Sequence, residues 1–162
     1  MSIDPATLPY RPCAGLMIIN REGHIFVGRR IDQKVEAWQL PQGGIDDGED
    51  ATTAAWRELT EETGITSDHA ELIAEAPGDY FYDLPPELIG RAWHGRYRGQ
   101  RMRWFLFRFT GSDADIDLAT HHQEFSAWRW ADQHDVVELA VPFKRDLYAE
   151  VMAAFADHLG PA

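Results

Sequence analysis

Apolar residues occur along this chain in short runs and alternating stretches, separated by polar turns. Two runs near the start flank Asn20–Gly23, a polar segment that predicts a tight turn between them. Five segments predict β-strands: residues 14–19, 25–27, 70–76, 101–109 and 127–130. Residues 79–88 contain Pro85 and Pro86, so we expect a loop there after a short extended piece.

Two other segments have the period of an amphipathic helix. Residues 51–63 follow Asp50, which with Thr53 is a candidate N-cap, and Gly64 supplies the glycine that favours a helix end. Residues 143–158 repeat apolar side chains at helical spacing and predict a C-terminal helix. Strands combined with two packed helices indicate a layered α/β arrangement.

Composition agrees with one domain over residues 1–162, with an ordered core of about residues 10–158. The hydrophobic share is 44%, enough for a real core, and no apolar run approaches the length of a membrane span. The first residues do not resemble a secretory signal. Cys13 is the single cysteine, which excludes an intramolecular disulfide. We expect its side chain to pack within a β-strand and to take no part in chemistry. A cytoplasmic location follows as an expectation.

The charge is strongly negative overall and unevenly distributed. The net charge of −12 disfavours binding to double-stranded DNA. Between Arg91 and Gly111, however, there are six arginines and no acidic residue, interleaved with aromatic residues. A solvated pair of strands is one interpretation. We favour a local basic wall for phosphates, in which the aromatic residues Trp93, Tyr97, Trp104 and Phe105 could stack bases.

Acidic residues are concentrated on the helix predicted over residues 51–63. Glu58, Glu61 and Glu62 stand at i, i+3 and i+4, so they share one face and repel each other. Arg57 is the one cation beside them. A solvated acidic surface would explain the three glutamates alone. Oxygen ligands with so few counter-charges also suit a hard divalent cation such as Mg²⁺.

The spacing of the surrounding residues favours the metal site. Residues 43 to 65 match the pattern G-x5-E-x7-R-E-U-x-E-E-x-G-U, with U aliphatic, at every specified position. The matching residues are Gly43, Glu49, Arg57, Glu58, Leu59, Glu61, Glu62, Gly64 and Ile65. This segment resembles the signature of the Nudix hydrolases. The resemblance implies a Nudix fold, an α/β/α sandwich with a central mixed sheet, and metal-dependent cleavage of a phosphoanhydride.

Flanking segments narrow the resemblance within that superfamily. They are residues 10–12, 38–45, 82–85, 123–125, 128–130 and 143–146. Together they resemble the branch of bacterial RNA pyrophosphohydrolases and diadenosine tetraphosphate hydrolases. Phe81 departs from the pattern, because relatives often have a basic residue before the tyrosine matched by Tyr82. This departure puts a phosphate contact from the Phe81 position in doubt.

The resemblance implies roles for particular residues. Glu58, Glu61, Glu62 and Glu124, with the backbone of Gly43, would bind two or three Mg²⁺ or Mn²⁺ ions, and one of Glu61, Glu62 or Glu124 would also act as general base. Arg57 would orient the glutamates, with Glu49 as its ion-pair partner or as a helix-start acid. Six residues would contact substrate: Arg11, Arg30, Tyr82, Arg101, Arg103 and Phe143. Core packing of Phe143 and a simple strand-end charge at Arg30 remain alternative interpretations.

The implied activity is removal of pyrophosphate from 5′-triphosphate RNA, leaving a 5′-monophosphate, with a role in mRNA decay. Hydrolysis of diadenosine tetraphosphate or a similar dinucleoside polyphosphate is the alternative. A catalytically silent nucleotide-binding module is disfavoured, because all three glutamates of the motif are present. The sequence leaves the oligomeric state and the choice of general base open.

Overall fold

The computed structural model describes residues 4–31, 36–120 and 123–159, and an eight-stranded mixed sheet forms its centre. The strands are β1 (Tyr10–Ile19), β2 (Ile25–Arg30), β3 (Trp38–Gln39), β4 (Gln42–Gly44), β5 (Ala70–Glu75), β6 (Tyr80–Asp83), β7 (Gly99–Phe109) and β8 (Phe125–Ala131). The main path runs β3-β2-β1-β7-β5, while β4, β6 and β8 pair with β1, β7 and β2. β1 and β7 are parallel and the other pairs are antiparallel, which confirms the predicted mixed sheet.

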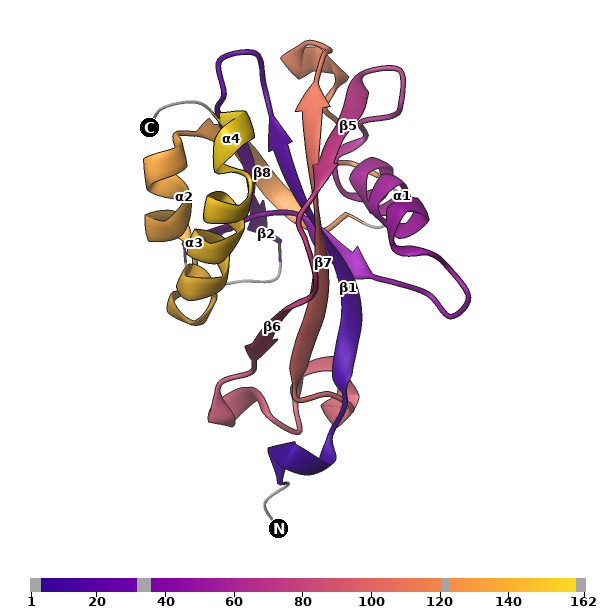
Figure 1. Ribbon diagram of the computed structural model, residues 1–162, viewed down its shortest axis with the longest axis vertical. Helices are drawn as coiled ribbons and strands as arrows, with labels where there is room; N and C mark the ends of the chain where they lie inside the picture. Colours follow the sequence, from indigo (N-terminus) through magenta and orange to yellow (C-terminus); the bar gives the residue numbers. More distant parts are fainter. Residues whose placement is uncertain (1–3, 32–35, 121–122, 160–162) are drawn as a thin grey trace.

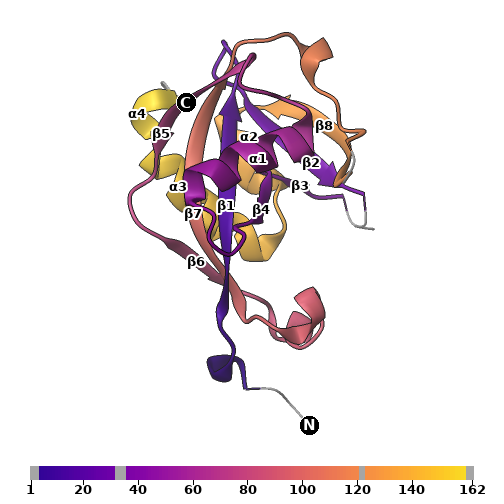
Figure 2. The ribbon, with the colours of Figure 1, turned by 90° about the vertical axis from the view of Figure 1, so that its right-hand side faces the viewer.

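Helices cover both faces of this sheet. They are α1 (Ala51–Thr63), α2 (Gln133–Leu139), α3 (Arg145–Ala154) and α4 (Ala156–Leu159). In Figures 1 and 2, α1 lies on one face, and α2, α3 and α4 lie together on the other. Each side has its own apolar core, with Leu59 and Phe107 on the α1 side and Trp104 and Tyr148 on the other. The arrangement is therefore the α/β/α sandwich that the sequence predicts.

Local signals determine both ends of α1, as the sequence predicts. The Asp50 carboxylate accepts a hydrogen bond from the Thr53 amide at 2.7 Å, which makes Asp50 the N-cap. Gly64 adopts a φ of 75°, the left-handed conformation that ends a helix at little steric cost when the residue is glycine. The apolar side of the helix, including Ala55 and Leu59, packs onto the sheet. This packing turns the glutamates of the same helix toward β4.

The C-terminal segment differs from the prediction of one helix over residues 143–158. Residues Pro142–Lys144 form a 3-10 turn, α3 begins at Arg145, and the helix is interrupted at Phe155 before α4. Val141 precedes a proline and is extended, with ψ at 144°, so α-helix cannot begin before Pro142. The apolar spacing of the sequence also does not predict α2. This helix has only one buried residue, Val136, and is too short to show a helical period.

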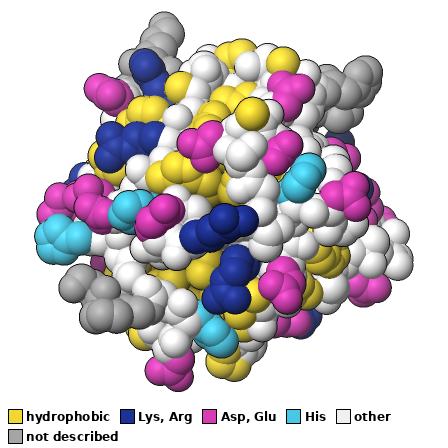
Figure 3. Space-filling view, turned by 90° about the horizontal axis from the view of Figure 1, so that it is seen from above, with side chains coloured by type: hydrophobic (Ala, Val, Ile, Leu, Met, Phe, Trp, Pro, Cys, Tyr) yellow, Lys and Arg dark blue, Asp and Glu magenta, His cyan; other side chains and the backbone are white. Residues whose placement is uncertain are grey.

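Successive side chains of β7 point to opposite faces of the sheet, so the side chains of the arginine-rich segment, residues 91–111, do not share one face. Trp104 and Phe105 are fully buried on opposite faces of the sheet, so the prediction that they stack bases is wrong. Arg98 pairs with Asp83, and Arg103 pairs with Glu75. The six arginines therefore do not form one continuous wall. Elsewhere, on the upper face of the molecule, acidic and basic side chains are intermingled (Figure 3).

Membrane insertion through a helix finds no support in the described part of the chain. None of its helices combines the length and the apolar character needed to cross a bilayer. Cys13 is fully buried in β1, as predicted, and burial raises the pKa of its thiol to about 11.

Candidate active site

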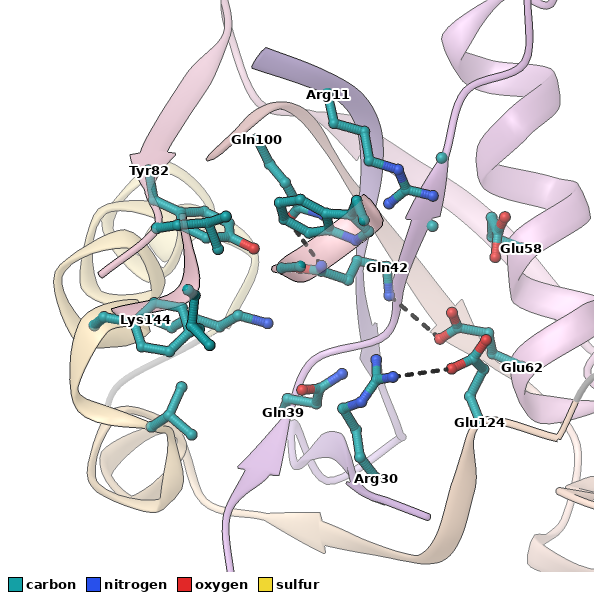
Figure 4. A pocket seen from close by; sticks show the side chains of 18 of the residues that line it. Arg11, Arg30, Gln39, Gln42, Glu58, Glu62, Tyr82, Gln100, Glu124 and Lys144 are labelled. Atoms are coloured by element: carbon teal, nitrogen blue, oxygen red, sulfur yellow. Dashed lines mark hydrogen bonds and ion pairs between the residues drawn. The ribbon is translucent and has the colours of Figure 1, made fainter. Parts of the chain in front are cut away.

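A cavity of about 660 Å³ opens between α1, β4, β6 and the start of α3. Nine of the residues expected in the site line it: Arg11, Arg30, Gly43, Glu58, Glu61, Glu62, Tyr82, Glu124 and Phe143. Figure 4 shows that acidic side chains gather on one side, while Tyr82 and Lys144 stand on the other. Residues from distant parts of the chain thus meet in one pocket.

Four carboxylates make the acidic wall. Glu58, Glu61 and Glu62 come from α1, and Glu124 comes from the residue directly before β8. Glu58 and Glu62 are only 8% and 5% exposed, although both are ionisable. The backbone amide of Gln42 in β4 donates to the Glu62 carboxylate at 3.3 Å. The helix face predicted from the i, i+3, i+4 spacing therefore points into a pocket and not into bulk solvent.

Arg57 holds this wall in place from behind. Its guanidinium donates to Glu49 at 2.8 and 2.9 Å, to Glu58 at 2.8 Å and to Glu61 at 3.1 Å. A further bond runs to the backbone carbonyl of Gly44 at 2.9 Å. These bonds hold the pKa of Glu49 down at about 2 and link α1 to β4 and the loop between them. Arg57 itself does not line the pocket, and it reaches the acidic wall through its bonds to Glu58 and Glu61.

Gly43 allows β4 to pass directly over Glu58. A Cβ built on Gly43 would lie 1.9 Å from the Cδ atom of Glu58 and about as close to both carboxylate oxygens. No residue other than glycine fits there without displacing that carboxylate. Glycine is therefore required at position 43 because the backbone there passes close to the carboxylate of Glu58.

Burial opposes ionisation of the two innermost carboxylates. Desolvation raises the pKa of Glu62 well above its usual range, and the negative charges of Glu58 and Glu124 raise it further. Burial also raises the pKa of Glu58, although Arg57 counteracts the shift. A positive ion placed among these groups would relieve the repulsion, so the electrostatics favour a bound cation.

Positive charge also lines the pocket. Arg11 and Arg30 line it near the acidic wall, and an Arg30 nitrogen stands 3.5 Å from the Glu124 carboxylate. Lys144 also lines it, with its ammonium 5.7 Å from the centre of the Tyr82 ring. Burial lowers the pKa of Lys144 to about 8, and the nearby Arg30 charge acts in the same direction while Glu62 opposes it. A cavity lined by both cations and carboxylates suits a polyphosphate with bound metal ions.

Two predicted substrate residues lie elsewhere. Arg101 and Arg103 alternate with Met102 along β7, so they stand on the other face of the sheet, beside Glu49, Asp50 and Asp79. The residue of β7 that lines the pocket is Gln100, whose amide oxygen accepts a hydrogen bond from Gln42 at 2.8 Å. The sequence analysis assigned no role to Gln42, Gln100 or Lys144. Lys144 is adjacent to Phe143 in residues 143–146, one of the segments that carry the family resemblance. Its place in that segment could have indicated a role for Lys144 in the site.

The donor set of the pocket fits divalent cations such as Mg²⁺. All four wall residues offer carboxylate oxygens, and Gly43 removes the side chain that would block their approach. Within the described ranges, no three His, Cys, Asp or Glu side chains already form a closed ligand group. Arg57 and Arg30 instead hold Glu58, Glu61 and Glu124. A cation would bind by replacing some of these contacts.

Comparison with known families decides the classification. The family model described as "NUDIX domain" matches residues 9–151. The chain belongs to the NUDIX family. Members of this family generally use divalent metal ions such as Mg²⁺, in agreement with the oxygen-rich wall of this NUDIX protein.

Curated relatives of this NUDIX protein match it over nearly its whole length. The protein named RNA pyrophosphohydrolase in Cereibacter sphaeroides is 58% identical over 98% of both chains. The one with the same name in Sphingopyxis alaskensis is 59% identical over 94% of this chain and 97% of its own. These identities also place the chain within the branch that its flanking segments resemble.

Solved structures of other NUDIX proteins share the fold at low sequence identity. The Escherichia coli dihydroneopterin triphosphate pyrophosphohydrolase superposes with a TM-score of 0.69 at 20% identity, covering 88% of this chain and 96% of that one. A binary complex of the Caenorhabditis elegans Ap4A hydrolase superposes with a TM-score of 0.66 at 22% identity, covering 91% and 98%. At such identities the likeness extends to the fold alone.

Proposed function

We propose that this NUDIX protein removes pyrophosphate from the 5′-triphosphate end of RNA and leaves a 5′-monophosphate. The observation that supports the proposal most is the near full-length similarity to proteins named RNA pyrophosphohydrolase. The pocket supports it further, because it is lined by the acidic wall and also by Arg11, Arg30 and Lys144. Such an arrangement suits a substrate that combines a polyphosphate with bound cations. The proposed substrate also implies a cytoplasmic location, which stays a prediction.

In the proposed reaction, Glu58, Glu61, Glu62 and Glu124 are the residues that would hold two or three Mg²⁺ ions. When bound, Mg²⁺ neutralises charge that develops on phosphoryl oxygens and makes the attacking water more acidic. Arg11, Arg30 and Lys144 hold the phosphates in place. One of Glu61, Glu62 or Glu124 accepts the proton of the water. The water oxygen forms a bond to the α-phosphorus as the α–β anhydride bond breaks, pyrophosphate leaves with the bonding electrons, and the RNA keeps its α-phosphate as a 5′-monophosphate.

Phe143 supplies a candidate platform for a base of the RNA. Its ring is 37% exposed at the pocket, 5.9 Å from the ring of Tyr82, so it is not buried in the core. Base stacking on an aromatic side chain contributes roughly 1–3 kcal/mol. Phe143→Ala is therefore expected to lower kcat/KM for triphosphate RNA by about 5- to 150-fold. Arg30→Ala is expected to act similarly, through loss of a phosphate or stacking contact.

Phe81→Ala is the matched control, because Phe81 is 50% exposed and lies outside the pocket lining. It should leave turnover unchanged. Rising salt should also depress RNA turnover more steeply than turnover of diadenosine tetraphosphate, because a longer polyanion releases more counterions. Equal salt slopes for the two substrates, together with unchanged RNA turnover in Phe143→Ala, would leave dinucleoside polyphosphate hydrolysis as the better account.

A further inference from the structure

Trp93 occupies a strained backbone position at the edge of the pocket. It has φ 50° and ψ 42°, and the next residue, His94, has φ 58° and ψ 27°. Two consecutive residues with side chains are thus in the left-handed region that normally favours glycine. Both lie in the 3-10 segment Ala92–Gly95 between β6 and β7. Strain of this kind persists only where the surrounding structure enforces it, and it is concentrated at functional sites.

The surrounding chain holds this segment tightly. The amide of Arg98 donates to the Pro9 carbonyl at 3.0 Å, and the Leu84 amide donates to the Arg98 carbonyl at 2.8 Å. Gly95 packs so closely on Gly90 that a Cβ added to Gly95 would lie 3.0 Å from the Gly90 carbonyl oxygen. The loop that carries Trp93 is therefore anchored through its backbone at Leu84 and Arg98.

The indole of Trp93 lines the pocket and lies against Arg11. The guanidinium carbon of Arg11 is 5.6 Å from the centre of the ring, within the range of a cation–π contact. On its other side the Arg11 guanidinium follows the backbone of β4, where a Cβ on Gly44 would lie 2.7 Å from it. Figure 4 shows the Arg11 side chain directed toward that strand and the acidic wall.

Arg11 differs from Arg57, Arg98 and Arg103 in the kind of partner it has. Arg57, Arg98 and Arg103 each bind carboxylates. Among the described residues, Arg11 has no carboxylate within ion-pair distance, and its polar contact is the Cys13 sulfur at 3.4 Å. A thiol and an indole face orient a guanidinium without neutralising it. The positive charge of Arg11 therefore remains available for an anion in the pocket.

We propose that Trp93 is a positioning residue, which holds the Arg11 guanidinium ready for the phosphates of the substrate through its aromatic face. The proposal rests on the proposed function, because it assumes a polyphosphate substrate. It explains why the chain tolerates strain at residues 93 and 94, since the strained backbone presents the ring to Arg11. It also gives Trp93 a part in binding that is distinct from the base stacking considered from the sequence.

The test compares Trp93→Phe with Trp93→Leu. Both new side chains are apolar and smaller than tryptophan, but only phenylalanine keeps an aromatic face. Trp93→Leu is expected to raise KM for triphosphate RNA by about 3- to 30-fold, the span of a cation–π contact, with kcat nearly unchanged. Trp93→Phe should retain most of the wild-type KM. His94→Asn, which removes the imidazole and tolerates the left-handed backbone at φ 58°, is the neighbouring control and should behave as wild type.

A double-mutant cycle with Arg11→Ala separates positioning from packing. In the Arg11→Ala background, Trp93→Leu should have little further effect, because the group that it positions is gone. The proposal is overturned if Trp93→Leu matches Trp93→Phe, or if its effect is the same with and without Arg11. Thermal midpoints identify any variant that is unfolded at the assay temperature. Wild-type protein inactive on triphosphate RNA but active on diadenosine tetraphosphate would overturn the proposed function alone, and the same cycle would then be judged on the dinucleotide.

Discussion

Glu62→Gln is expected to lower kcat by roughly 10²–10⁴-fold at saturating Mg²⁺, the range typical of a lost electrostatic or acid–base group. Glu61→Gln is expected to fall in the same range. Both variants keep the shape of the side chain and remove its charge. Glu62 is 5% exposed and its pKa is raised by burial and by neighbouring carboxylates, so losing that charge should leave the thermal midpoint unchanged or higher.

The measurement is kcat over a Mg²⁺ series, with a thermal midpoint for each variant. Glu150→Gln is a suitable control, because Glu150 is an exposed glutamate on α3, outside the pocket. Activity near the wild-type level in both Glu61→Gln and Glu62→Gln would refute the assignment of these carboxylates to metal binding and catalysis.

Gly43→Val is expected to reduce kcat by about 100-fold, the cost typical of moving a catalytic group by about 1 Å. The new Cβ would stand 1.9 Å from the Cδ atom of Glu58, so this carboxylate must move away from its present position against Arg57. The loss should be much larger in activity than in the thermal midpoint, because the clash is with a carboxylate that lines the pocket and not with an apolar side chain of the core.

Gly48→Asn provides the control within the same loop. A Cβ at Gly48 meets nothing within 4 Å, and asparagine tolerates the φ of 79° found there. Its activity should remain close to wild type. If Gly43→Val loses stability in proportion to activity, Gly43 supports the fold only, and its link to the catalytic carboxylate is wrong.

Local signals explain which parts of the fold could be predicted. Both ends of α1 were predicted because its caps, Asp50 and Gly64, act within a few residues of chain. The 3-10 turn before α3 was missed because apolar spacing alone does not separate a 3-10 turn from an α-helix. The turn depends on the extended backbone before Pro142, a local rule that outweighs the hydrophobic period.

The sequence predicts the positions of the site residues that belong to the motif, but not the positions of most residues outside it. The spacing of Glu58, Glu61 and Glu62 places them on one face of α1, whatever packs against that face. The positions of Arg101 and Arg103 depend instead on which face of β7 turns toward the pocket, and that face presents Gln100. The contact between Trp93 and Arg11 joins a strained loop to β1. Spacing along the chain carries no information on such a contact.

In our proposal, a 5′-triphosphate RNA is the preferred substrate of this pocket. The direct measurement is kcat/KM with Mg²⁺ on 5′-triphosphate RNA and, separately, on diadenosine tetraphosphate, with the products identified at the RNA 5′ end. We predict a higher kcat/KM for the RNA, with release of pyrophosphate and a 5′-monophosphate end. A higher kcat/KM for the dinucleotide, or no pyrophosphate released from the RNA, would contradict it.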